Sequence, residues 1–139
     1  MEHAQQLIDQ AYAARKAGNQ PLALELYLTA VEALRPSNEP LRLAHTIRHV
    51  ADIQRSSNLL EAAHANYAEA LAIYRSQPTT SKLDLANTLR GYALLSQTTG
   101  DISKARKLWT QARALYSNVN VQAGVEEADH HLATMPVAQ

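Results

Sequence analysis

The feature that most constrains the fold of this chain is a unit of 40 to 42 residues that occurs three times. Gly18, Asn58 and Gly100 mark the units, because glycine and asparagine accept the left-handed backbone that ends a helix. After each of them comes an alanine five positions on, a large aromatic four positions further, and a second alanine three positions beyond that. Steps of four and three residues lie on one helix face, which predicts a small–large–small contact surface. The three sets are Ala23, Tyr27 and Ala30; Ala63, Tyr67 and Ala70; and Ala105, Trp109 and Ala112.

The segments that precede the turns repeat as well. Residues 43–51 align with residues 85–93 at a shift of 42, with five of nine positions identical. Each unit therefore contains two helices, and a period of this length is typical of a solenoid whose units bury their apolar faces against one another. We expect helices over residues 2–17, 21–35, 40–57, 59–76, 82–99, 101–117 and 121–134.

Short motifs predict where individual helices begin. Ser81 with Asp84, and Asn58 with Glu61, have the spacing of a capping box. Asp101 stands where it can cap the helix that follows the third turn. These three positions predict side-chain caps at three helix starts.

Composition agrees with a helical protein and excludes several classes. Alanine and leucine, which favour helices, account for 25 and 19 of the 139 residues, so we expect an all-α protein. Lysine plus arginine equals aspartate plus glutamate at 13 each, which argues against a nucleic-acid or membrane-surface partner. Cysteine is absent, which excludes disulfides and thiolate metal sites. The polar first residues lack a hydrophobic signal region, so we expect a cytoplasmic protein.

This pattern resembles the tetratricopeptide repeat (TPR). The small residue that the family carries late in its first helix is matched by Ala11, Ala51 and Ala93, and its alanine–aromatic–alanine set by the three sets above. The family's usual unit has about 34 residues; the longer unit here is similar to the repeats of kinesin light chains. The resemblance implies a right-handed α-solenoid in a single domain over residues 1–139. It would hold hairpins at about residues 2–36, 40–77 and 82–117 and a capping helix at 121–134.

The resemblance also implies that the first helix of each hairpin lines a concave groove that binds a peptide or helix of a partner protein. Arg48 and Arg90 take equivalent positions there, and a planar guanidinium suits a carboxylate or backbone carbonyls. The alternative is that they are solvated or paired locally, Arg48 with Asp52 four residues on. The expected groove residues are Tyr12, His45, Arg48, His49, Asp52, Arg55, Asn87, Arg90, Leu94 and Gln97.

The leading hypothesis is a non-enzymatic protein-binding module with no catalytic residues and no cofactor. One alternative is a structural protein that self-associates. Another is a small metal-binding protein that uses His45, His49 and Asp52, whose spacing places them on one helix face. The large aromatics at the helix contacts are expected to fill the core rather than to bind ligand. These are Tyr27, Tyr67, Tyr74, Trp109 and Tyr116.

Overall fold

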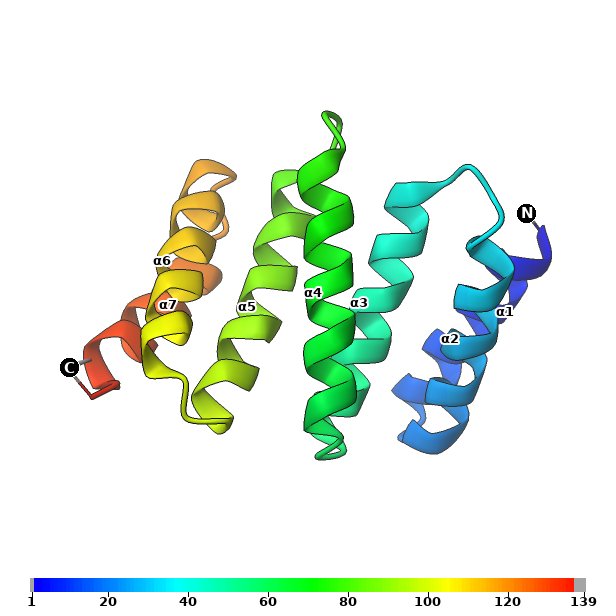
Figure 1. Cartoon of the computed structure of the whole chain (residues 1–139), viewed down its shortest axis with the longest axis horizontal. Helices are drawn as coiled ribbons and strands as arrows, with labels where there is room; N and C mark the ends of the chain where they lie inside the picture. Colours follow the sequence, from blue (N-terminus) through cyan, green and yellow to red (C-terminus); the bar gives the residue numbers. More distant parts are fainter. Residues whose placement is uncertain (1, 137–139) are drawn as a thin grey trace. The chain divides into compact units, whose positions relative to one another are not determined.

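The computed structural model describes residues 2–136, with the side chains of residues 3–136, and this part of the chain contains seven α-helices and no β-strand (Figure 1). The all-α prediction is confirmed, and every predicted helix is present with its ends within one residue of the prediction. The helices are α1 (Glu2–Lys16), α2 (Gln20–Leu34), α3 (Pro40–Ser56), α4 (Leu60–Ser76), α5 (Lys82–Thr98), α6 (Ile102–Asn118) and α7 (Gln122–Thr134).

The helices pack as consecutive hairpins within two compact units. Unit 1 is Met1–Gln77 and unit 2 is Pro78–Gln139. In unit 1, α1 packs on α2, α2 on α3, and α3 on α4; in unit 2, α5 packs on α6 and α6 on α7. In the view of Figure 1, α2 lies in front of α1, and α6 lies in front of α7. This order of packing confirms TPR-like hairpins, whereas a single domain over residues 1–139 with the predicted repeat bounds stays a prediction.

Residues in the left-handed conformation end four of the helices. Gly18, Asn58 and Gly100 have φ angles of 84°, 63° and 86°, as the turn spacing predicted. Asn120, with a φ of 62°, ends α6 in the same way and was not singled out from the sequence. The predicted capping box at Asn58 and Glu61 is therefore wrong: Asn58 ends the hairpin's first helix, and the N-cap of α4 is the next residue, whose side chain makes no capping bond.

Side-chain oxygens cap three other helices. Ser81 Oγ accepts from the amide of Asp84 at 3.2 Å, and Asp101 Oδ1 accepts from the amide of Lys104 at 3.2 Å, so both predicted caps are confirmed. Asn19 Oδ1 caps α2 in the same way, although the sequence pattern did not single it out. These bonds satisfy amides that a helix start would otherwise leave unpaired.

The predicted small–large–small faces form the core. All nine residues of the three sets are at most 1% exposed, and Ala11, Ala51 and Ala93 are fully buried. Tyr74 and Tyr116 are 2% and 3% exposed, so the prediction that the large aromatics fill the core is confirmed. The alanines let the helices of a hairpin approach closely, and the aromatic ring fills the space that remains between them.

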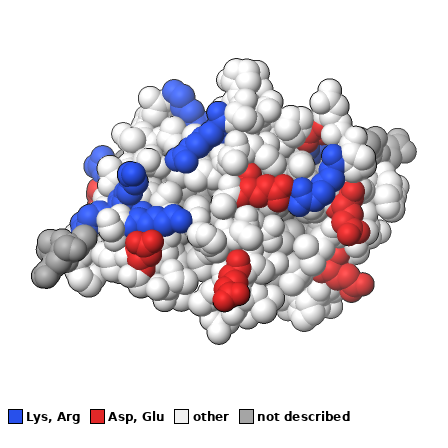
Figure 2. All heavy atoms as spheres, in the orientation of Figure 1, with Lys and Arg blue, Asp and Glu red and all other residues white. Residues whose placement is uncertain are grey.

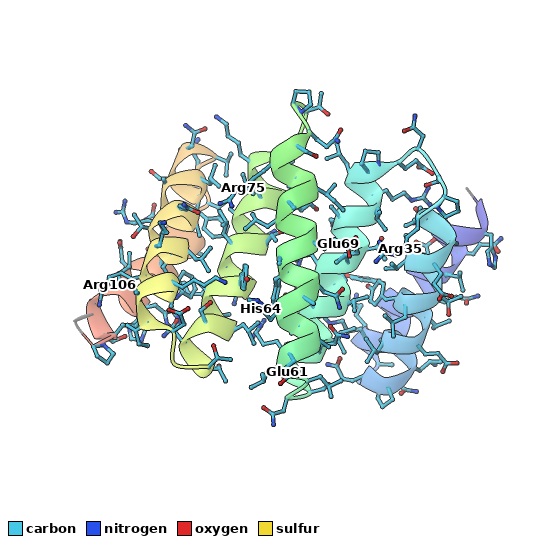
Figure 3. The ribbon with its side chains drawn as sticks, in the orientation of Figure 1. Arg35, Glu61, His64, Glu69, Arg75 and Arg106 are labelled. Carbon is cyan, nitrogen blue, oxygen red and sulfur yellow. The ribbon has the colours of Figure 1, made fainter. Side chains whose placement is uncertain are left out.

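The second helices present a mixed polar surface. Arg35 donates to both carboxylate oxygens of Glu69, at 2.7 and 3.0 Å, and so joins the end of α2 to α4 (Figure 3). In unit 2, Arg106 of α6 donates to the backbone oxygens of Leu132, Met135 and Pro136 at the end of α7. On the face drawn in Figure 2, acidic side chains gather over α2 and α4 and basic ones over α6. No helix within the described residues has the length and apolar character needed to cross a membrane.

Candidate functional site

Asp52, one of the predicted groove residues, is the centre of a buried polar network. Its Oδ2 accepts from Arg48 Nη1 at 2.9 Å, and its Oδ1 accepts from the hydroxyl of Tyr67 on α4. The same hydroxyl accepts from Arg55 Nε at 3.0 Å. Asp52 is 8% exposed and Tyr67 is fully buried, so the network lies inside the α3–α4 hairpin. Arg48 is therefore paired locally, as the alternative reading of the sequence supposed.

The network also changes the acidity of the tyrosine. Burial of Tyr67, and after it the negative charge of Asp52, raise the pKa of the Tyr67 hydroxyl above its ordinary value. The hydroxyl therefore remains protonated and donates to the carboxylate at any physiological pH. Tyr67 acts as a fixed donor that holds α4 against the charged groups of α3.

The equivalent position in the third hairpin makes an uncharged version of this contact. Gln97 Oε1 accepts from the indole nitrogen of Trp109 at 2.5 Å. Arg55 and Gln97 each lie 12 residues ahead of the aromatic ring that they contact. Leu94, half-buried, takes the place that Asp52 has in the second hairpin. Arg55 and Gln97 thus hold the two helices of their own hairpins together.

His49 of α3 lies at a pocket of about 310 Å³ on the first helices of unit 1. The pocket is lined by His49 together with Tyr12, Arg15 and Lys16 from the end of α1. Tyr12 is 55% exposed, whereas Arg15 and His49 are half-buried. Two predicted groove residues, Tyr12 and His49, are therefore brought together here. Arg15 and Lys16 were not predicted, although Arg15 precedes Arg55 by the repeat length of 40 residues.

The hydrogen bonds of His49 determine its protonation. Arg15 Nη1 lies 3.2 Å from His49 Nδ1, and a guanidinium can only donate, so Nδ1 accepts and the ring proton sits on Nε2. Burial, and after it the charges of Arg48, His45 and Arg15, lower the pKa of His49 from 6.5 to about 3. His49 is thus a neutral imidazole with a defined tautomer.

A second pocket, of about 430 Å³, lies on unit 2. Asn87 and Arg90, both predicted groove residues, line it, and Leu83 at its edge is 40% exposed. Arg90 donates from Nε and Nη2 to the two carboxylate oxygens of Glu127 on α7, at 2.5 and 3.0 Å. Asn87 Oδ1 accepts from the hydroxyl of Tyr116 at 2.6 Å. Arg90 and Asn87 therefore both contribute to helix packing and line the pocket.

The geometry does not support the metal-binding alternative. Nδ1 of His49 is occupied by Arg15, and the oxygens of Asp52 accept from Arg48 and Tyr67. Across the part of the chain that the structure describes, no three or more His, Cys, Asp or Glu side chains are grouped so that they could hold a metal ion. His45, His49 and Asp52 share a helix, but the contacts that they make do not form a ligand set.

The predicted groove residues fall into two groups, one in each unit. Whether the two groups serve one partner stays a prediction. Unit 1 carries Tyr12, His45, Arg48, His49, Asp52 and Arg55, and unit 2 carries Asn87, Arg90, Leu94 and Gln97.

Comparison with known proteins agrees with the helical-hairpin architecture. The family model described as soluble NSF attachment protein, SNAP, matches residues 1–128. Among solved structures, BtubC (BKLC) from P. vanneervenii is similar, with a TM-score of 0.72 and 16% sequence identity over 98% of this chain and 67% of BtubC. At an identity this low, the structural similarity is informative about the fold alone. It confirms the predicted TPR-like fold. A comparison with curated protein sequences finds no match.

Proposed function

The chain belongs to the soluble NSF attachment protein (SNAP) family, and from this premise we propose that it holds a segment of a partner polypeptide against the first helices of its hairpins. Domains of this TPR-like kind form a non-catalytic fold family and typically bind proteins. In proteins built from helical hairpins, the repeated helices offer an extended surface, which suits an extended segment better than a small substrate.

One observation carries this proposal: each unit has a surface pocket lined by first-helix residues that the repeat pattern had singled out. These are Tyr12 and His49 in unit 1, and Asn87 and Arg90 in unit 2. Each pocket also has a large side chain at its surface, since Tyr12 is 55% and Leu83 is 40% exposed. Tyrosine and arginine are enriched at the hot spots of protein interfaces, and the two pockets contain Tyr12, Arg15 and Arg90.

The contacts divide the predicted groove residues by role. Asp52, Arg55 and Gln97 already form hydrogen bonds with the second helix of their own hairpin. We therefore assign them the role of holding the two helices in position. Arg90 is engaged with Glu127, so a carboxylate of the partner would have to compete with that ion pair. We therefore assign the direct contacts to Tyr12 and Leu83, with the pocket residues around them.

The test compares exposed apolar residues on the two sides of the hairpins. A partner recovered by affinity capture is purified, and its binding to the full chain is measured by calorimetry. Tyr12→Ala with Leu83→Ala should weaken binding more than tenfold. Leu28→Ala is the matched control, because Leu28 is 42% exposed but lies on the second helix α2. Unchanged affinity in the double variant, or an equal loss in the control, would contradict the proposal.

Self-association is the second candidate, and the second helices favour it. α2 exposes Leu22 and Leu28, each 42%, and carries only acidic charges, Glu25 and Glu32. α6 carries four basic residues and no acidic one. Such complementary faces could join one copy to the next in a head-to-tail manner. Light scattering over a range of concentrations, repeated with Glu25→Lys and Glu32→Lys, separates a self-associating protein from a monomer that binds other proteins.

A further inference from the structure

The pocket at the end of α1 gathers positive charge that carboxylates do not balance. Arg15 and Lys16 are consecutive at the end of the helix, and Lys16 Nζ lies 5.6 Å from the ring centroid of Tyr12. Within the described residues, neither Arg15 nor Lys16 forms an ion pair. The end of a helix supplies only about half a negative charge, so most of the charge of two cations remains.

Two described acids on α1 and α3 already accept hydrogen bonds from other side chains. Asp9, on α1, accepts from Gln5 at 2.8 Å. Asp52, on α3, accepts from Arg48 and Tyr67. Three other arginines, Arg35, Arg90 and Arg113, each face a carboxylate on another helix.

His49, which lines the same pocket, lies in the field of these positive charges. Besides burial, the charges of Arg48 and Arg15 lower the pKa of His49, and no carboxylate acts in the opposite direction. The hydrogen bond from Arg15 to Nδ1 holds the guanidinium beside the His49 ring.

We propose that this pocket binds the phosphate monoester of a phosphorylated side chain on the partner segment. A phosphate monoester carries about two negative charges and three acceptor oxygens. The two cations, neither of which forms an ion pair within the described residues, match its charge, and Arg15 and Lys16 supply donors for its oxygens. A single carboxylate would neutralise only one of the two cations. The inference rests on the proposed function, since it concerns what a bound polypeptide carries at this position.

A protein ligand suits the pocket better than a membrane surface does. Lipid headgroups are usually held by clusters of about four to eight basic residues that lie against the bilayer. Here the chain is neutral overall, with 13 basic and 13 acidic residues, and the pocket contributes two cations. Two cations are enough to bind a single phosphate group on a peptide, whereas a membrane surface requires a larger basic surface.

The test is a titration of the full ¹⁵N-labelled chain with phosphoserine blocked at both ends, followed by NMR. We expect saturable chemical-shift changes of the amide signals of residues 12–17 and of residues around His49. Blocked glutamate should bind with at least tenfold lower affinity, and blocked serine should not bind. Arg15→Gln with Lys16→Gln should abolish the shifts. Lys107→Gln is the matched control, because Lys107 is an exposed cation on α6 that also lacks an ion pair.

Several results would overturn the inference. They are the absence of saturable shifts, equal affinity for blocked glutamate, and an equal loss of binding in Lys107→Gln. Binding to phosphatidylcholine vesicles that contain a phosphoinositide, without binding to blocked phosphoserine, would assign the pocket to lipid instead. A partner that still depends on Tyr12 and Leu83 while phosphoserine does not bind would refute this inference alone. If phosphoserine binds but the affinity for the partner does not change when Tyr12 and Leu83 are replaced, the proposed function is refuted and the phosphate-binding pocket is retained.

Discussion

The imidazole ring of His49 stacks face to face on the phenol ring of Tyr27, with centroids 5.2 Å apart and planes within 4° of parallel. Unit 2 repeats the arrangement, since His131 of α7 stacks on Trp109 of α6 at 4.5 Å and 7°. In both units the aromatic of a second helix is covered by a histidine of the next helix along the chain. Burial lowers the pKa of both histidines, which favours the neutral form of the stacked rings.

This relationship predicts that His49 makes the protein less stable in acid. The pKa of His49 is about 3 in the folded chain and 6.5 in its ordinary state, so the unfolded chain takes up the proton first as the pH falls. Stability is therefore fully present above pH 6.5 and decreases toward pH 3. Between pH 7 and pH 5, His49 alone should lower the free energy of unfolding by about 2 kcal/mol.

Urea unfolding at the two pH values measures this effect. His49→Gln removes the titrating group, so the variant should lose about 2 kcal/mol less than the parent over the same interval. An equal loss in both proteins would show that other groups cause the acid sensitivity.

The Asp52 network predicts that a single hydroxyl stabilises the second hairpin. Tyr67→Phe leaves the buried Asp52 Oδ1 and Arg55 Nε without the group that joins them. The free energy of unfolding should fall by about 1–3 kcal/mol. Tyr12→Phe is the control, because the Tyr12 side chain is 55% exposed, and it should change stability by less than about 0.5 kcal/mol.

Close packing of α7 on α6 predicts that Gly124 does not tolerate a side chain. A Cβ on Gly124 would overlap the ring of Tyr116. Gly124→Ala should destabilise the chain by about 1–3 kcal/mol. Leu34 occupies the position of Tyr116 in the first hairpin, so Gly124→Ala combined with Tyr116→Leu should cost less than the sum of the single changes. Thermal unfolding of the four proteins gives the coupling, and strict additivity would contradict the predicted overlap.

The left-handed turn at Gly100 predicts that a side chain there lowers the free energy of unfolding through backbone strain and not through steric overlap. Its φ is 86°, and a Cβ there would meet no atom within 4 Å. Gly100→Ala should therefore cost about 1–2 kcal/mol of unfolding free energy. Gly100→Asn should cost less, because Asn58 adopts the same conformation at the equivalent turn. If the two variants were equally stable, backbone strain would not be the cause.

Much of the fold could be predicted because its signals are local and repeated. The turn at Gly18, the alanine–aromatic sets and the cap at Ser81 each act within a few residues, and the turn and the alanine–aromatic set occur in all three units. The capping box at Asn58 failed for a physical reason: asparagine can cap one helix or end another, and the choice depends on the φ that the turn adopts. The same turn at Asn120 lies outside the period and was missed.

The candidate site was less predictable, because its contacts join residues that are far apart in the sequence. Helical spacing placed Arg55 and Gln97 on the first helices, but only the packed hairpins show that they bond to Tyr67 and Trp109. Arg15 meets His49 across 34 residues. The sequence signal that could have identified Arg15 is its position one repeat before Arg55. That signal indicates on which face of the helix Arg15 lies, but not which residue it contacts.

The seven helices, their pairing into hairpins and the faces that they bury all follow from local signals in the amino-acid sequence. Helix propensity, turn conformation and apolar spacing act over short distances and are repeated in each unit. Which charges are neutralised depends on the packed helices: Arg48 pairs with Asp52, whereas Arg15 contacts the neutral His49 and, like Lys16, forms no ion pair within the described residues. The strength of an ion pair and the cost of burying it depend on distances and on exclusion of water, and both exist only after the helices have packed.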